Sequence, residues 1–480
     1  MNKLRHIRLP GLIASSGLLA LLAATPVLGA DLGGNCCADL EERVAELEAT
    51  SARKGNRKVS LTVSGHVNEA VMFWDDGSET NAYVVTNNAS RTRFRFVGDA
   101  KINADWSAGY LLELGVRYAG SQSRTQFTNG AGGDANQIDI RHSAWWIENK
   151  QLGRVWVGET SSATDGITEI NLSQVLIGGQ DQFFTAGNGF RLRAAGSAPG
   201  AAGISGLNWQ NLAQTSTTQP GEGDRNNIVR YVSPTIAGFN FSAAWGEDDM
   251  WDVALRYAGE FSGVRLAAGI GYRQINDFNT GDGMSGCANL GPAAAQGTTL
   301  LTGATGTAPT SSAVDCNSWG GSIAVMHVPT GLFASFAYGK EEDDNRKALF
   351  GANVKDDAEG YFVMAGIEKN WFGLGATSIY GEYSHGEYGA SLNNGSIRTL
   401  AATDPLNSLG ATARISSSET DVWGVGIQQA VDAAAMELYI GYKNYSGEAR
   451  LSATGSSAGS IASRSIDDFQ LVIAGARIRF

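Results

Sequence analysis

Residues 264–273 read VRLAAGIGYR, and their side chains alternate with a period of two. One face collects Val264, Leu266, Ala268, Ile270 and Tyr272, and the other collects Arg265, Ala267, Gly269, Gly271 and Arg273. This period predicts a β-strand, because successive side chains of a strand point to opposite faces. Strands of soluble proteins average about 5–6 residues. A run of about ten residues has the length that a tilted strand needs to cross a bilayer.

The same pattern recurs along the chain. Residues 91–96, RTRFRF, place three arginines on one face and two phenylalanines on the other. Sixteen such segments are expected at 59–75, 90–104, 106–119, 137–150, 152–160, 226–235, 237–248, 250–259, 261–276, 317–329, 331–341, 358–371, 373–386, 418–431, 433–447 and 465–480. Their polar faces carry Arg, Glu, Gly and Gln, as a water-filled barrel interior permits.

The connections between these segments alternate in length. Short turns are expected around Ala104-Asp105, Lys150-Gln151, Ser233-Pro234-Thr235, Gly259-Glu260, Pro329-Thr330, Asn370-Trp371 and Val431-Asp432. Long connections cover 120–136, 161–225, 277–316, 342–357, 387–417 and 448–464, and only 247–250 is short on that side. Short periplasmic turns and long extracellular loops produce this alternation. The sequence therefore predicts an all-β fold, a sixteen-stranded antiparallel transmembrane β-barrel.

Two segments precede the predicted barrel at 59–480. Residues 1–30 have the basic start, apolar stretch and small-residue cleavage region of a secretory signal peptide, with cleavage expected after Ala30 or Gly29. Residues 31–58 form a periplasmic leader, in which 38–54 has the spacing of a short coiled-coil-like N-terminal helix. A helix of this length is marginal alone. Three readings stay open for it: association of several copies, a cell-wall tether, and a frayed linker.

The four cysteines fall into two unlike pairs. Cys287 and Cys316 bracket a long loop, and the secretory signal implies an oxidising compartment, so we expect a disulfide between them. Such a bond stabilises by roughly 3–4 kcal/mol on the loop-entropy account. Cys36 and Cys37 are adjacent, where a bond between neighbours is strained. Pairing between chains and free thiols both stay open for them.

Composition excludes several classes of function. The formal net charge is −12, which leaves no basic excess for nucleic acid. Four histidines follow the signal segment, namely His66, His142, His327 and His385. They lie on separate predicted strands, with no nucleophile elbow and no metal-type spacing near them. We therefore expect no enzyme activity, no catalytic residues, no metal and no cofactor.

Together, these features resemble the trimeric, sixteen-stranded porins of Gram-negative bacteria, most closely the alphaproteobacterial type. The resemblance covers about 59–480 and rests on the opening strand VSLTVSGHV at 59–67, RTRFRF at 91–96, GRVWVGET at 153–160 and the terminal Ile478-Arg479-Phe480. It implies a water-filled channel in the outer membrane for passive diffusion of ions and small hydrophilic solutes. It also implies a homotrimer among outer-membrane lipid and lipopolysaccharide, with Phe480 read by the barrel-assembly machinery. A channel selective for one substrate is the alternative.

In that family the third extracellular loop folds inward and narrows the barrel. The resemblance assigns this role to 161–225, whose acidic residues Asp165, Glu169 and Asp181 become candidates for the constriction. The polar strand faces supply candidates for a basic pore lining at Arg91, Arg93, Arg95, Arg117 and Arg141. On the lipid face an arginine near the midplane would cost roughly 2–4 kcal/mol, so these side chains belong inside. Opposed acids and arginines would set a transverse field, although any one arginine is equally expected to pair with loop carboxylates or to face lumen water.

Overall fold

The computed structural model divides into two units, Met1–Arg57 and Lys58–Phe480. The structure describes residues 59–127, 137–178, 185–193, 208–213, 220–246, 249–276, 315–343, 355–389, 397–399, 412–453 and 461–480. The predicted signal peptide, leader and helix 38–54 lie outside this part of the chain. Among the described residues, no helix combines the length and the apolar character that crossing a membrane requires.

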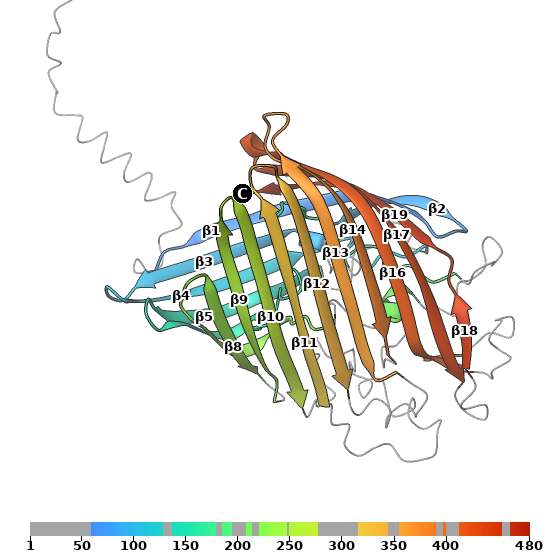
Figure 1. Ribbon diagram of the computed structural model, residues 1–480, viewed down its shortest axis with the longest axis horizontal. Coiled ribbons are helices and arrows are strands. Elements are labelled where there is room, and N and C mark those ends of the chain that lie inside the picture. Colours follow the sequence, from blue (N-terminus) through green and yellow to red (C-terminus); the bar gives the residue numbers. More distant parts are fainter. Residues whose placement is uncertain are drawn as a thin grey trace, which may run out of the picture. The chain divides into compact units, whose positions relative to one another are not determined.

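In the described part of the chain, nineteen strands form one antiparallel sheet, whose arrangement is drawn in Figure 1. They are β1 (Thr62–Asp75), β2 (Thr80–Thr86), β3 (Arg93–Lys101), β4 (Trp106–Val116), β5 (Ile138–Asn149), β6 (Gly153–Ser161), β7 (Arg225–Val232), β8 (Phe239–Gly246), β9 (Trp251–Phe261), β10 (Val264–Asn276), β11 (Asp315–His327), β12 (Leu332–Asp343), β13 (Asp357–Lys369), β14 (Thr377–Tyr388), β15 (Ile397–Thr399), β16 (Thr412–Val431), β17 (Met436–Ala453), β18 (Ile461–Ser465) and β19 (Phe469–Arg479). The described helices are short: η1 (Asn88–Ser90), α3 (Trp209–Ala213) and η3 (Asp432–Ala434).

The sheet closes on itself as a barrel. Strand β1 pairs with β19 on one side and with β2 and β3 on the other. Three pairs of segments each act as one strand of the barrel. Strands β2 and β3 pair with different parts of β1, and β18 and β19 pair with different parts of β17. Strand β15 pairs with β16 beyond the end of β14, which pairs with the rest of β16. The nineteen segments therefore occupy sixteen positions. The predicted sixteen-stranded antiparallel barrel is confirmed.

The two faces of each strand differ as the period of two requires. On β1, Val67, Val71 and Phe73 are exposed on the outer face, whereas Met72 and Trp74 are buried on the inner face. An outer face of apolar side chains suits lipid contact. Towards the loop ends, outward aromatic rings pair across neighbouring strands, in the pairs Trp251–Tyr272, Trp319–Tyr338, Tyr361–Tyr383 and Trp423–Tyr442. This aromatic band is typical of a membrane interface.

Beyond the aromatic band, four glutamates form a row on the outer face. Strand register places Glu359 opposite Glu387, Glu387 opposite Glu419, and Glu419 opposite Glu448. Like charges directly opposite one another destabilise a sheet. Lys355 Nζ pairs with Glu387 at 2.8 Å, and the other three glutamates leave a net negative charge along the row. It was not visible in the sequence, because its members come from four separate strands.

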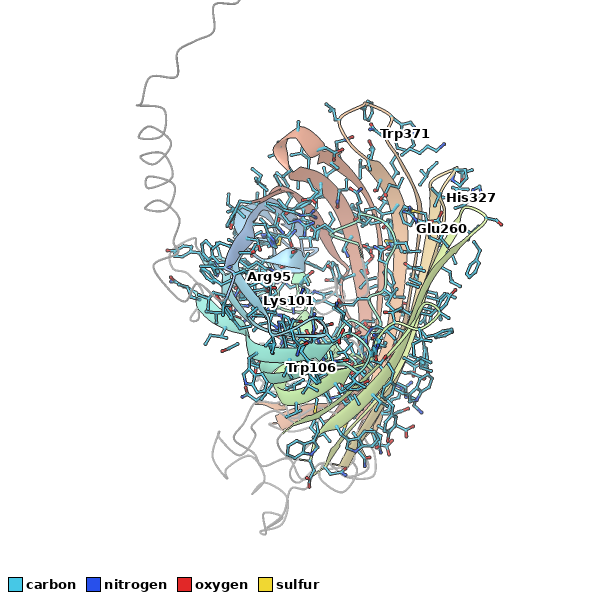
Figure 2. All side chains as sticks on the ribbon, turned by 90° about the vertical axis from the view of Figure 1, so that its left-hand side faces the viewer. Arg95, Lys101, Trp106, Glu260, His327 and Trp371 are labelled. Carbon is cyan, nitrogen blue, oxygen red and sulfur yellow. The ribbon has the colours of Figure 1, made fainter. Side chains whose placement is uncertain are left out.

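The short turns lie at one end of the barrel, where Glu260, His327 and Trp371 line the same rim (Figure 2). The turn between β9 and β10 differs from the prediction, since it is formed by Ser262 and Gly263 rather than by Gly259 and Glu260. Both residues have positive φ, 50° and 79°. Two positive φ values match the hairpin turn whose twist agrees with that of the flanking strands, and glycine adopts this backbone readily.

Candidate functional site

The connection between β6 and β7, residues 162–224, turns into the barrel. Backbone groups of its described parts form hydrogen bonds with inward side chains of successive strands. Near its start, the backbone N–H groups of Ala163 and Thr164 donate to Asp252 (3.1 and 2.8 Å). Further along, backbone N–H groups donate in the pairs Ile170–Ser322 (3.2 Å), Gln174–Glu368 (2.7 Å) and Leu176–Gln428 (2.8 Å), and the Ala186 carbonyl accepts from the Tyr445 hydroxyl (3.1 Å). These partners run from β9 to β17. The connection is thus fixed along the inner wall.

Glycines on the wall make room for this connection. A Cβ atom on Gly339 would lie 1.7 Å from the carbonyl oxygen of Pro220, and one on Gly441 would lie 2.7 Å from Ile177 Cδ1. The first contact is with backbone, so a side chain at position 339 would displace the loop. The many lumen-facing glycines of the sequence therefore have a packing role.

An apolar cluster fills one part of the interior. Trp209 of α3 and Phe190 of the connection are almost fully buried, and they pack with Tyr445 of β17 and Phe469 of β19. Ring centroids in this group lie 4.8–6.3 Å apart, within the range of favourable aromatic pairs. Water-soluble solutes are excluded from such a packed region. The charged inner face of β3–β5 lies in another part of the wall.

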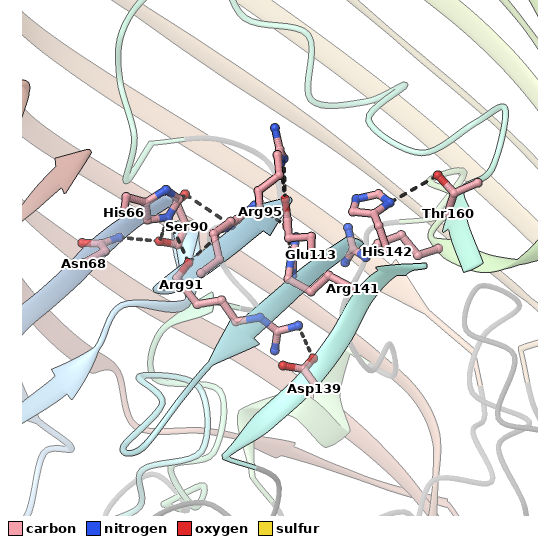
Figure 3. Close-up of polar contacts among 12 residues, drawn as sticks. His66, Asn68, Ser90, Arg91, Arg95, Glu113, Asp139, Arg141, His142 and Thr160 are labelled. Atoms are coloured by element: carbon pink, nitrogen blue, oxygen red, sulfur yellow. Dashed lines mark hydrogen bonds and ion pairs between the residues drawn. The ribbon is translucent and has the colours of Figure 1, made fainter. Parts of the chain in front are cut away.

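The arginines of β3 and β5 converge on one carboxylate (Figure 3). Glu113 of β4 has a fully buried side chain, and it pairs with Arg93 Nη1 at 3.2 Å, Arg95 Nη2 at 2.5 Å and Arg141 Nε at 2.7 Å. We call these four residues the arginine cluster. Three guanidinium groups share one carboxylate, so the cluster carries a local excess of positive charge. Arg91 instead pairs with Asp139 of β5.

Neither Glu113 nor Asp139 was singled out from the sequence. Glu113 lies on the polar face of its strand, which was visible in the alternation of residues 110–118. Its pairing depends on the register of β3 with β4 and on an irregularity at Glu113 and Leu114 in the pairing of β4 with β5. The fifth predicted pore-lining arginine, Arg117, lies just past the end of β4, where its backbone N–H donates to the carbonyl of Gln137 (2.8 Å).

The predicted acidic residues of the connection have different surroundings. Asp165 lies 3.9 Å from Arg225 Nη1, and Glu169 is exposed. Burial raises the pKa of the Asp165 carboxyl above its ordinary value. Asp181 lies outside the described residues.

The sequence reading missed Glu222, a buried acid near the end of the connection. Its carboxylate accepts the backbone N–H groups of Ile167 (3.0 Å) and Thr168 (2.6 Å). It thereby ties the two ends of the connection together. Burial, followed by the negative charge of Asp165, raises the pKa of Glu222 from 4.5 to about 8.

A second inward segment also narrows the interior. Residues 87–92 leave the wall between β2 and β3, and η1 lies inside the barrel, where the Ser90 carbonyl accepts from Asn68 Nδ2 (2.8 Å) and the Ser90 hydroxyl accepts from Arg477 Nη1 (3.1 Å). Asn87 Nδ2 donates to the hydroxyl of Tyr439 (2.9 Å). The prediction of one continuous strand from residue 90 was therefore wrong at its beginning.

Two further predicted positions lie away from the interior passage. Phe480 is exposed at the end of the last strand, and its ring lies 6.2 Å from that of Phe94. Cys316 at the start of β11 is buried and disulfide-bonded. Cys287 lies outside the described residues, so its pairing with Cys316 stays a prediction.

A group with metal-ligating side chains lies on the outer face. His385, Glu419 and Asp421 bring potential ligand atoms within 4.8 Å of one another. Asp421 already accepts hydrogen bonds from Tyr383 and from His385 Nδ1 (2.9 Å) in the tautomer that carries its proton there. Local hydrogen bonding accounts for this arrangement.

A closed membrane barrel with a charged interior, narrowed by its own inward-folded connection, defines an outer-membrane channel. A family model described as Gram-negative porin matches residues 17–365, and the chain belongs to this family. The protein is thus a porin of the Gram-negative outer membrane, a passive channel for ions and small hydrophilic solutes. The family is one of channels rather than of enzymes.

Several solved structures are similar to the chain. A loop L8 deletion mutant of OmpT, an outer membrane protein of Vibrio cholerae, is 12% identical, with 88% of this chain and 100% of that chain covered and a TM-score of 0.48. The anion-selective porin from Comamonas acidovorans is 16% identical, with 88% and 100% covered and a TM-score of 0.45. OmpF of Salmonella typhi in complex with daunomycin is 12% identical, with 88% and 98% covered and a TM-score of 0.44. A comparison with curated protein sequences finds no match.

Proposed function

We propose that solutes pass between the arginine cluster and the inward connection, and that this passage sets the selectivity of the channel. The observation that carries the proposal is the sharing of Glu113 by Arg93, Arg95 and Arg141. The excess positive charge of the cluster faces an interior in which Asp165 and Glu169 lie on the connection. The apolar cluster around Trp209 supports the same route, because it leaves the charged part of the interior to water.

A transverse field across this passage would act on every solute. Positive charge is fixed on β3–β5, and the carboxylates of Asp165 and Asp224 belong to the connection, where Arg225 lies near both. A field confined by low-dielectric walls is stronger than the same charges would produce in open water. Polar solutes align in it, whereas apolar solutes would have to displace ordered water.

Planar-bilayer measurements test the proposal. The purified protein should conduct in steps, and its reversal potential in a salt gradient should report the ion preference. Arg93→Ala and Arg95→Ala should shift that potential towards cation preference. Arg265→Ala is a matched control, because Arg265 is half-exposed at the barrel rim and pairs with Glu260 at 2.9 Å. An unchanged reversal potential in both arginine-cluster variants would place the selectivity elsewhere.

We further propose a homotrimer of the alphaproteobacterial type, associated through the outer face of β1. Glu69 is exposed on that face between Val67 and Val71, and its carboxylate accepts from Thr86 (3.1 Å) and Thr92 (3.3 Å). A carboxylate facing lipid is unfavourable. A second copy of the chain would cover the face and supply polar groups. Sedimentation in detergent tests the assembly, with three chains expected.

The N-terminal segments belong to the same proposal. Residues 1–30 would be removed as a signal peptide, and the leader 31–58 would extend into the periplasm ahead of the barrel domain 59–480. Deletion of 36–54 separates two roles for the leader. Loss of trimers would assign it to assembly, whereas loss of envelope attachment with normal conductance would assign it to tethering.

Biogenesis and lipid contact complete the proposal. Phe480 would be recognised by the barrel-assembly machinery, since it ends the last strand and is 58% exposed. Lipopolysaccharide would contact the outer face beyond the aromatic band. Deleting Phe480 should lower the amount of folded barrel in the outer membrane, as measured by the heat-dependent mobility of the protein in gels.

A further inference from the structure

A cavity of ≈ 170 Å³ lies between the inward connection and the inner wall of β11–β13. Residues of the segment 168–178 supply one side, Ser322, Ser335 and Phe362 belong to the wall, and Ala89 of η1 also lines the cavity. An engineered cavity of about 150 Å³ in another protein admits benzene. This cavity therefore has room for a six-membered ring.

One buried residue in the wall of the cavity has a hydroxyl group without a hydrogen bond in the described structure. Ser335 of β12 is 8% exposed, and its hydroxyl makes no hydrogen bond within the described part of the protein. Buried hydroxyl groups are nearly always hydrogen-bonded to protein, water or ligand, and leaving one unsatisfied costs about 1–3 kcal/mol. The Ser335 hydroxyl is therefore placed to bind a polar group in the cavity.

Further polar groups lie on the loop side. The Asn171 side-chain oxygen accepts both the backbone N–H and the hydroxyl of Ser173 (2.9 Å each), which leaves the amide N–H groups available. Glu169 contributes an exposed carboxylate. The residues around the cavity thus offer a hydroxyl, an amide donor and a carboxylate acceptor.

The remaining lining is apolar and carries no basic side chain. Phe362 and Met364 are buried on β13, and Val175 and Leu176 cover the loop side. The described lining contains no Lys, Arg or His. An anion would meet the negative charge of Glu169 and no basic side chain in the described lining. An ammonium group could approach the exposed carboxylate of Glu169, but beside the neutral Ser335 and the apolar lining it would lose its hydration.

We infer that this cavity is a binding site for a neutral, polyhydroxylated ring of monosaccharide size. Such a ring has weakly polar faces for Phe362, Met364 and Leu176, and hydroxyl groups that both donate and accept hydrogen bonds. The inference rests on the proposed channel, because the ligand reaches the cavity from the water-filled interior. The cavity would then retard passing sugars beside the main passage.

Single-channel recording with D-glucose tests the inference. Glucose should reduce the current through the wild-type channel in a concentration-dependent way. Loss of one neutral hydrogen bond should raise the half-blocking concentration in Ser335→Ala by about threefold to tenfold. Asn171→Ala should act in the same direction. Gluconate, an anion of similar size, should block less than glucose.

Ser318→Ala is the matched control. Ser318 lies on the neighbouring strand β11, is fully buried, and also has a hydroxyl without a hydrogen bond in the described structure, but it does not line the cavity. Its half-blocking concentration should equal that of the wild type. Equal blocking in Ser335→Ala and wild type, or a conducting channel that glucose never blocks, would overturn the inference and leave the channel intact. A protein that never conducts would overturn the channel as well.

Discussion

The backbone of Phe480 exchanges two hydrogen bonds with that of Gly65, N–H to carbonyl oxygen in both directions and 3.0 Å each. This pair closes the barrel between its last residue and its first strand. A Cβ atom at position 65 would lie 2.6 Å from the Phe480 ring and 2.3 Å from the backbone oxygen of Arg93. The closing contact thus requires glycine at that position.

Gly65→Ala should weaken barrel closure. The added methyl group forces the Phe480 ring or the β3 backbone to move, and overpacking of this kind typically costs about 1–3 kcal/mol. The melting temperature of the folded band in heat-dependent gels measures the effect. Gly381→Ala is the control, because the nearest atom to a Cβ there lies 3.8 Å away. Equal losses in both variants would show that the contact with Phe480 is not responsible.

Glu113→Gln should destabilise the barrel and increase anion preference. The change removes the only carboxylate paired with Arg93, Arg95 and Arg141 among the contacts described for them. Breaking a buried ion pair typically costs about 3–5 kcal/mol, because the remaining charge is left uncompensated. Thermal unfolding and the reversal potential measure the two effects. Glu148→Gln should change both little, since Glu148 and Arg154 form a partly exposed pair.

Glu222→Gln should flatten the pH dependence of stability. The raised pKa of Glu222, from 4.5 to about 8, means that the folded protein binds this proton more tightly than the unfolded chain. The corresponding stabilisation is complete below pH 4.5 and is lost as pH rises to about 8. Unfolding temperatures at pH 5 and pH 9 should differ more for the wild type than for the variant. A parallel shift of both proteins would contradict the burial of a proton at this position.

Glu419→Gln should stabilise the barrel by about 0.2–1 kcal/mol, because it removes the middle repulsions of the glutamate row. Salt screens exposed charges, so the gain should shrink at high ionic strength. Chemical or thermal unfolding at two salt concentrations measures this. Glu260→Gln serves for comparison, since Glu260 pairs with Arg265 instead of facing another carboxylate. A stabilisation independent of salt would point to a cause other than charge.

Most strands of the barrel wall could be predicted from the sequence. Each predicted strand overlaps an observed one, because alternation of side chains is a local property that a buried and a lipid-exposed face impose together. The inward turn at residues 87–92 could not be predicted from the sequence. It depends on Asn68, Tyr439 and Arg477, which the chain brings together only after closure.

The sequence predicted which charged side chains face the interior, but it did not predict which residues they pair with. Arg93 and Arg95 were assigned to the interior by their period of two, whereas their shared contact with Glu113 depends on strand register. Asp165 was identified as a loop acid, yet the structure places it near Arg225 at the start of β7. Glu222 gave no signal, since one acid in a long loop looks the same whether it is solvated or buried.

The apolar cluster around Trp209 also constrains the order of biogenesis. Trp209 precedes β19 by more than 250 residues, yet it packs against Phe469 of that strand. A wall that closed first would have to thread a bulky segment into a finished cylinder. We therefore expect the connection to enter before the β1–β19 seam closes, so that the last strand docks on a loop already in place. Pairing of β1 with β19 would then depend on the inward connection having already packed inside the barrel.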